Sequence, residues 1–289
     1  MGSMEHVLQM DRDLIREVLD TSPVDLKKIR GIGIGLPGIL NERAGTVRET
    51  AHGGVRINNV TARDGWESDF KLPIFVGNDA TLAGYGELRL GLDRPVNNLV
   101  YLYSYVGASL IVNGHIYWGS SGSAGELDLF VSSDDDYLTW VNPPSPSSSL
   151  LKYWDLGLTA QARRMVEEGY PTLIKENVNG NLEAITMDTI IQTAQSGDQL
   201  TRELIENSAL QLGIRVASLV NLLNPEVIVI GGGIEKAGAL LLEPVWRAVK
   251  RYAYEEPASL VDVLPAKLGE NAVALGAACW VIREIFIQA

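Results

Sequence analysis

An amide and a carboxylate stand next to each other at the end of a short apolar run. The run is Ile74-Phe75-Val76, bounded by Pro73 and Gly77, and it predicts a buried strand. Asn78 and Asp79 follow directly, where a helix rich in small residues begins. Open α/β sheets bind ligands at the carboxyl ends of their strands. An aspartate there can take a proton from a hydroxyl, and the asparagine can hold a second hydroxyl. The pair would equally serve to cap the helix, and the spacing alone does not separate the two roles.

Two other stretches put a carboxylate or a glycine turn at the end of a predicted element. A Gly/Ser run over 119–125 ends at Glu126, after a hairpin whose two-residue turn is Asn113-Gly114. A buried strand over 226–230 runs into three glycines, Gly231, Gly232 and Gly233. Such a turn lets a ligand approach the backbone, but it is also a routine way to start a helix.

Composition limits the classes of partner. The chain has 289 residues, enough for two domains, and a net charge of −12. An acidic surface repels phosphate backbones, so we expect no nucleic-acid binding by this chain alone. Cys279 is the one cysteine, which allows no intrachain disulfide and fits a reducing cytoplasm. No apolar run reaches the roughly 18 residues of a membrane span, so no membrane association is expected.

The hydrophobic pattern alternates between helical and strand periods, which predicts an α/β chain. Helices are expected over 5–21, 61–71, 159–168, 184–195, 198–223, 238–252 and 271–287. Strands are expected over 32–36, 74–76, 99–103, 108–112, 226–230 and 260–264, with a hairpin or long loop over 39–60. The Asp/Pro/Ser-rich stretch 132–149 predicts a surface loop.

Five motifs in this order resemble those of the ROK family (repressors, open reading frames and sugar kinases), over roughly residues 5–289. They are GIGIGLPG at 31–38, VGNDATLAGYGE at 76–87, VNGHIYWGSSGSAGEL at 112–127, NPEVIVIGGGIEKAG at 224–238 and LGENAVALGAA at 268–278. The resemblance implies the actin-like, ribonuclease-H-like fold of sugar kinases, with two α/β domains and a central cleft. It places the first domain at 1–101 with 273–289 and the second at 102–272. Kinase members of the family move the ATP γ-phosphate to a sugar hydroxyl, and repressor members sense sugars in the cleft.

The resemblance also implies roles for single residues. Asp79 falls at the position of the family's catalytic base, and Asn78 at that of a sugar-hydroxyl ligand. Glu126 matches the family's sugar-binding glutamate. The turn Gly231, Gly232 and Gly233 matches the one beside the adenosine of ATP.

This sequence departs from the family pattern at both of the family's phosphate-binding segments. The opening Asp-x-Gly-x-Thr hairpin is absent, so we expect the first domain to be truncated at its N-terminus. The second phosphate loop, Gly-Thr-Gly-x-Gly-Ala in the family, reads Tyr103-Ser104-Tyr105-Val106-Gly107-Ala108 here. Phosphate cradles need glycine so that backbone N–H groups can face the anion, and a tyrosine fills that space.

The sugar and zinc motifs are changed as well. The family histidine that contacts sugar, and often zinc, is Leu129, and the insertion 132–149 replaces the cysteine-rich zinc loop. A family asparagine aligns with Gly53 of His52-Gly53. Asn78, Asp79 and Glu126 therefore remain as the sugar contacts, and neither a metal nor a cofactor is expected.

Three hypotheses follow. In the first, the chain is the effector domain of a regulator-like member and binds a sugar or related polar metabolite without catalysis. In the second, it belongs to a working ATP-dependent sugar kinase. In the third, it is a non-binding dimerisation scaffold. Self-association into a homo-oligomer is also expected.

Overall fold

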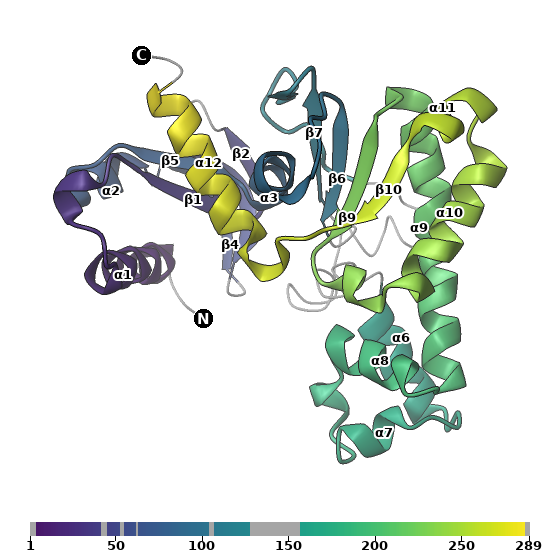
Figure 1. Ribbon diagram of the computed structural model, residues 1–289. Helices are drawn as coiled ribbons and strands as arrows, with labels where there is room; N and C mark the ends of the chain where they lie inside the picture. Colours follow the sequence, from purple (N-terminus) through teal and green to yellow (C-terminus); the bar gives the residue numbers. More distant parts are fainter. Residues whose placement is uncertain are drawn as a thin grey trace.

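The computed structural model describes residues 4–41, 45–52, 55–61, 63–103, 107–127 and 157–286 (Figure 1). Its strands are β1 (Ile32–Leu36), β2 (Ile39–Asn41), β3 (Thr46–His52), β4 (Val55–Thr61), β5 (Ile74–Asn78), β6 (Leu99–Tyr103), β7 (Gly107–Val112), β8 (His115–Ile116), β9 (Val227–Gly231) and β10 (Asp262–Pro265). Its α-helices are α1 (Met4–Thr21), α2 (Arg63–Phe70), α3 (Asp79–Gly86), α6 (Leu158–Glu167), α7 (Ile174–Asn177), α8 (Met187–Gln195), α9 (Gln199–Leu223), α10 (Ala239–Tyr252), α11 (Glu255–Leu260) and α12 (Ala272–Phe286).

The first part of the chain builds two small sheets. β1 and β5 pair in parallel, from Ile32 opposite Ile74 to Leu36 opposite Asn78. The stretch expected to be a hairpin or long loop supplies β2, β3 and β4, which form an antiparallel sheet in that order. One face of the β1–β5 pair packs on an apolar cluster that includes Ile15 of α1 and Trp66 of α2.

Glycines in β1 let α12 lie directly on the other face of this pair. A Cβ added at Gly33 would lie 2.7 Å from the carbonyl oxygen of Ala277, which is closer than real side chains approach. The interleaved glycines of the 31–38 motif are therefore explained by close contact between a strand and a helix. The C-terminal helix thus packs on a strand formed more than 230 residues earlier in the chain.

The second sheet has five strands in the order β10-β9-β6-β7-β8. β6 pairs in parallel with β9 and antiparallel with β7. The predicted hairpin turn is confirmed, because Asn113 and Gly114 both have positive φ, at 53° and 77°, as a two-residue hairpin of this hand requires. Helices α9 and α10 cover one face of the sheet, and α6, α7 and α8 gather at the far end of α9 (Figure 1).

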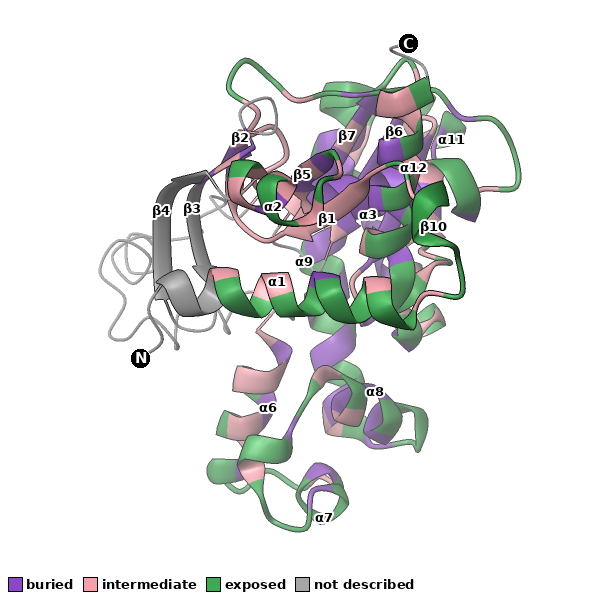
Figure 2. Ribbon diagram, turned by 90° about the vertical axis from the view of Figure 1, so that its left-hand side faces the viewer, coloured by how far each residue is buried: buried purple, intermediate pink, exposed green. Residues whose placement is uncertain are grey.

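Helices α3 and α12 lie between the two parts, and small residues allow them to pack closely. A Cβ at Gly86 would lie 2.9 Å from the Ala272 carbonyl oxygen, and one at Gly84 would lie 2.7 Å from Ser109 Oγ of β7. Figure 2 shows the buried residues concentrated in α3, β6 and β7, whereas α1 is largely exposed. The division into 1–101 with 273–289 and 102–272 stays a prediction.

The predicted helices and strands are found. The short α-helix α7 lies in a stretch for which the sequence pattern predicts no element, and α11 precedes β10, which begins two residues later than the predicted strand 260–264. Among the described helices, none is both long enough and apolar enough to cross a membrane.

Candidate functional site

Asn78 ends β5 and caps α3. Its Oδ1 accepts the N–H of Thr81 at 2.9 Å, and its Nδ2 donates to the carbonyl oxygen of Gly38 at 3.1 Å. The capping role considered from the sequence is therefore confirmed for this residue. The second contact ties the start of α3 to the turn that follows β1. A second N–H remains on the amide, so the cap does not exclude a ligand contact.

Asp79 is the first residue of α3, and its carboxylate lies in a largely desolvated position. Its Oδ1 accepts the N–H of Ala80 at 2.8 Å. Burial raises its pKa from the ordinary aspartate value to about 6, and the backbone hydrogen bonds only partly oppose this. A carboxylate with this pKa can accept a proton or a hydrogen bond from a hydroxyl near neutral pH.

The structure brings the backbone of Glu126 toward the start of α3. Glu126 forms an isolated antiparallel bridge with Gly107, and Ala108 donates its N–H to the carbonyl oxygen of Gly125 at 2.7 Å. Gly107 in turn lies against Ala80, since a Cβ there would be 2.9 Å from the Ala80 Cβ. Two predicted sugar contacts that are 47 positions apart in sequence thus approach each other through Gly107.

The carboxyl ends of β6 and β9 lie side by side in the five-stranded sheet. Tyr103 is opposite Gly231 in the parallel ladder. Burial, and then the charges of Asp79 and Glu235, raise the pKa of the Tyr103 phenol. The ring of Tyr103 stacks on that of Tyr101 at 6.2 Å between centroids. A phenol therefore lies beside Gly231, at the position that the motif resemblance aligns with the first glycine of the family phosphate loop.

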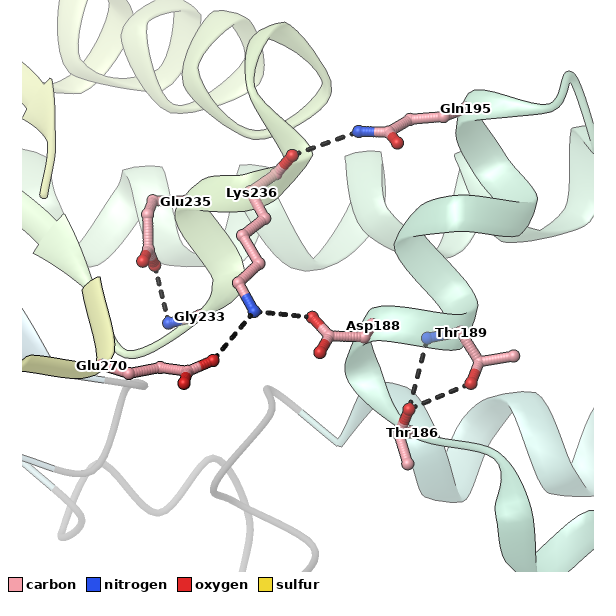
Figure 3. A network of polar contacts seen from close by, with 8 residues as sticks. All are labelled: Thr186, Asp188, Thr189, Gln195, Gly233, Glu235, Lys236 and Glu270. Atoms are coloured by element: carbon pink, nitrogen blue, oxygen red, sulfur yellow. Dashed lines mark hydrogen bonds and ion pairs between the residues drawn. The ribbon is translucent and has the colours of Figure 1, made fainter. Parts of the chain in front are cut away.

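The backbone of the glycine turn after β9 is already hydrogen-bonded to an acidic side chain of the same chain. Gly232 and Gly233 have positive φ, at 86° and 104°, a conformation that glycine adopts readily. The N–H of Gly233 donates to Glu235 Oε2 at 2.6 Å (Figure 3). Burial raises the pKa of Glu235. The sequence reasoning did not identify Glu235, although an acid two residues after a glycine turn was a visible signal.

Lys236 connects three segments beside this turn. Its Nζ lies 3.0 Å from a carboxylate oxygen of Asp188 on α8 and 3.7 Å from one of Glu270, just before α12 (Figure 3). Gln195 donates to the carbonyl oxygen of Lys236 at 3.2 Å. The ammonium faces two carboxylates, which raise its pKa. The segment that follows the glycine turn is therefore held by the chain's own polar groups.

The sequence reasoning also missed the buried Glu87, which directly follows α3. It is buried, and its Oε1 accepts the N–H groups of Lys267 and Leu268 at 2.9 and 2.8 Å. These bonds join α3 to the segment that leads from β10 to α12. Burial raises the pKa of this carboxyl, although both backbone bonds oppose the shift.

Several predictions lie outside the described residues. They concern Ser104, Tyr105 and Val106 of the altered phosphate loop, Leu129, Gly53, and the 132–149 insertion. The side chain of His52 is also outside the description. Within the described part of the chain, no group of three or more His, Cys, Asp or Glu side chains could hold a metal ion.

The architecture defines the class of protein: a two-domain α/β chain with the actin-like, ribonuclease-H-like fold of sugar kinases. The crystal structure of a ROK family transcriptional regulator, a homologue of the E. coli MLC protein, superposes with a TM-score of 0.75 at 23% identity. The match covers 97% of this chain and 68% of that one.

The model of the ROK family matches residues 4–128 and 165–284, and the chain belongs to the ROK family. It is 30% identical to the xylose repressor of Caldicellulosiruptor bescii over 286 residues, which is 97% of this chain and 69% of the repressor. It is also 30% identical to the glucokinase of Halalkalibacterium halodurans over 266 residues, which is 88% of this chain and 76% of the kinase. The family resemblance inferred from the motifs is confirmed.

Proposed function

We propose that this chain is the effector-binding part of a ROK regulator and that it binds a sugar or related polar metabolite through Asp79, Glu126 and Asn78. The observation that carries the proposal is the approach of Glu126 to the start of α3, through the bridge to Gly107 and the contact of Gly107 with Ala80. Carboxylates accept hydrogen bonds from sugar hydroxyls, and charge-assisted bonds of this kind contribute roughly 1.5–3 kcal/mol each.

Binding without catalysis is favoured by what surrounds the glycine turn. Glu235 accepts the N–H of Gly233, and Tyr103 stands beside the same turn. By the family resemblance the adenosine of ATP would lie beside this turn, where Glu235 already takes the N–H of Gly233. Phosphoryl transfer depends on holding phosphates in position, and Tyr103 stands where the resemblance places the first glycine of the second phosphate loop, which opposes it. Similarity to a xylose repressor supports the regulator assignment.

The proposal is tested by ligand-induced stabilisation. A ligand that binds only the folded state raises the melting temperature by mass action. We expect one class among pentoses, hexoses and acetylated amino sugars to raise the melting temperature of the wild-type chain. Asp79→Ala should abolish the rise, whereas Asp20→Ala, at an exposed carboxylate of α1, should preserve it. A wild-type chain that no sugar stabilises, or a full response in Asp79→Ala, would contradict the proposal.

A sugar kinase is the second candidate, because the glucokinase of Halalkalibacterium halodurans is equally similar in sequence. Asp79, with a pKa of about 6, has the properties of a general base. A scaffold that binds no ligand is the third candidate, and the stabilisation experiment separates it from the first. We further propose a cytoplasmic location, self-association, and no specific binding of DNA by this chain alone, the last because its net charge is −12.

A further inference from the structure

Tyr103 stands in a row of residues that crosses the sheet at the carboxyl ends of β6 and β9. It lies opposite Gly107 of β7 on one side and opposite Gly231 of β9 on the other. Gly107 is in turn bridged to Glu126. Residues directly opposite each other in a ladder project their side chains from the same face of the sheet. The side chains of Tyr103 and Glu126 therefore leave the same face, and the two glycines place no side chain beside the tyrosine ring.

This face of the sheet is the one that packs against α3. Tyr101, two residues before Tyr103 and on the same face, belongs with it to an apolar cluster that includes part of α3. In the row itself, Gly107 lies against Ala80, which directly follows Asp79. Helices α9 and α10 cover the opposite face (Figure 1). The ring of Tyr103 therefore lies on the side of the sheet where α3 begins.

The surroundings of Tyr103 fix its ring and leave its hydroxyl among acidic groups. The ring stacks on Tyr101, which is 1% exposed. Burial, followed by the negative charges of Asp79 and Glu235, raises the pKa of the Tyr103 phenol. The phenol therefore stays protonated at neutral pH and can donate a hydrogen bond.

A donor at this position complements the predicted sugar contacts. Each sugar hydroxyl both donates and accepts, whereas the ionised carboxylates of Asp79 and Glu126 only accept. Tyr103 adds a donor on the same side of the site, beside the second N–H of Asn78. A tyrosine ring also offers a large, rigid contact area at a low cost in conformational entropy. The row thus brings an aromatic surface and a donor to the candidate sugar site.

A phosphate group would find opposite conditions here. Phosphate sites are built from cations and from free backbone N–H groups. The carboxylates of Asp79 and Glu235 repel an anion, and Glu235 already takes the N–H of Gly233. The ammonium of Lys236 is engaged by two carboxylates. The site therefore disfavours a phosphorylated sugar.

We propose that Tyr103 contacts the bound sugar, with its ring against the sugar and its hydroxyl donating to a sugar oxygen, and that the site selects an uncharged, unphosphorylated sugar. The row that joins Tyr103 through Gly107 to Glu126 carries the proposal. It rests on the proposed function, because it adds a contact and a ligand class to the same site. The aligned glycine of the family pattern has no side chain with which to make this contact.

Isothermal titration calorimetry with matched pairs of probes tests the ligand class. The probes are xylose, glucose and N-acetylglucosamine, each beside its 1-phosphate, and the last two also beside their 6-phosphates. We expect at least one unphosphorylated sugar to bind. Its phosphates should bind at least about tenfold more weakly, because they bring a negative charge to the carboxylates.

Substitutions of Tyr103 test the contact itself. Tyr103→Phe keeps the ring and should weaken binding of the sugar about three- to tenfold. Tyr103→Ala also removes the ring, so it should weaken sugar binding further and reduce the discrimination against the phosphate. A purely structural role would weaken both ligands in proportion. Tyr254→Phe and Tyr254→Ala, at a residue that is 76% exposed, should change neither affinity. Thermal melting without ligand checks that all four variants fold.

The possible outcomes separate this inference from the proposed function. A sugar phosphate that binds as tightly as its parent sugar, or tighter, would overturn the inference. So would a sugar affinity that both Tyr103 variants leave unchanged. Either result would leave sugar binding at Asp79 standing. A wild-type chain that binds none of the probes would overturn the proposed function and this inference together.

Discussion

The carboxylate of Glu235 accepts a hydrogen bond of 2.6 Å from the backbone N–H of Gly233. Glycine turns bind anions because their N–H groups are free to face them. Here the chain's own acid takes that donor, and the adjacent Lys236 is engaged by Asp188 and Glu270. The turn therefore keeps its glycine conformation, but a ligand that used the N–H of Gly233 would have to displace Glu235.

We accordingly expect no ATP-dependent phosphorylation of sugars. An assay that couples ADP release to an optical signal, with Mg²⁺ and a panel of hexoses, amino sugars and acetylated amino sugars, should show no turnover above background. Asp79→Asn serves as the matched control, since it removes the only base proposed for transfer. Turnover in the wild-type chain that disappears in Asp79→Asn would establish the kinase alternative.

The buried carboxylate of Asp79 should make stability depend on pH. Its folded-state pKa of about 6 lies above the ordinary value of 3.8. The stability that this group contributes is fully present below pH 3.8 and is lost as the pH rises through about 6. Asp79→Asn removes the charged form, so the variant should be more stable than the wild type at pH 8, by at most about 3 kcal/mol.

Thermal melting from pH 4 to pH 8 checks this linkage. The advantage of Asp79→Asn should grow with pH and vanish near pH 4. Asp20→Asn, at an exposed carboxylate, should show no such trend. An Asp79→Asn variant that is less stable than the wild type at pH 8 would mean that the ionised carboxylate has partners that offset its burial.

Glu87 should contribute to stability through its two backbone acceptor bonds. Glu87→Ala leaves the N–H groups of Lys267 and Leu268 without their acceptor, and we expect a loss of about 2–4 kcal/mol in the free energy of unfolding. Both bonds go to Oε1, so Glu87→Gln keeps an acceptor oxygen and should lose about 1 kcal/mol. Urea unfolding of the two variants measures the difference. Equal losses would assign the effect to packing rather than to these bonds.

Gly33 should tolerate no side chain. Gly33→Ala would push a Cβ against the backbone of Ala277, so we expect about 1–3 kcal/mol of destabilisation. The control is Gly65→Ala in α2, where the added Cβ would lie 3.4 Å from an Arg12 side-chain nitrogen. That change should stabilise by about 0.4–1 kcal/mol, because alanine restricts the unfolded chain at a helical position. Denaturant midpoints of the two variants should therefore move in opposite directions.

Local sequence determined the helices and strands, and it placed Asn78 and Asp79 of the candidate site at the junction of a strand and a helix. An apolar run ending in Asn78 and Asp79 is a strand that runs into a helix, because strand period and capping chemistry act over a few residues. Asn113-Gly114 specified its turn because few other pairs adopt positive φ at both positions. The motif order likewise identified the family, since five separate stretches had to match together.

Tertiary structure alone decided how these parts meet. Glu126 approaches the start of α3 only because β7 carries Gly107 between them, and Glu87 reaches residues 180 positions further along the chain. The glycines of β1 are explained by their close contact with α12, and the acid in the glycine turn by the hydrogen bond that Glu235 accepts from Gly233. No local pattern encodes such contacts, because they depend on which elements are neighbours in space.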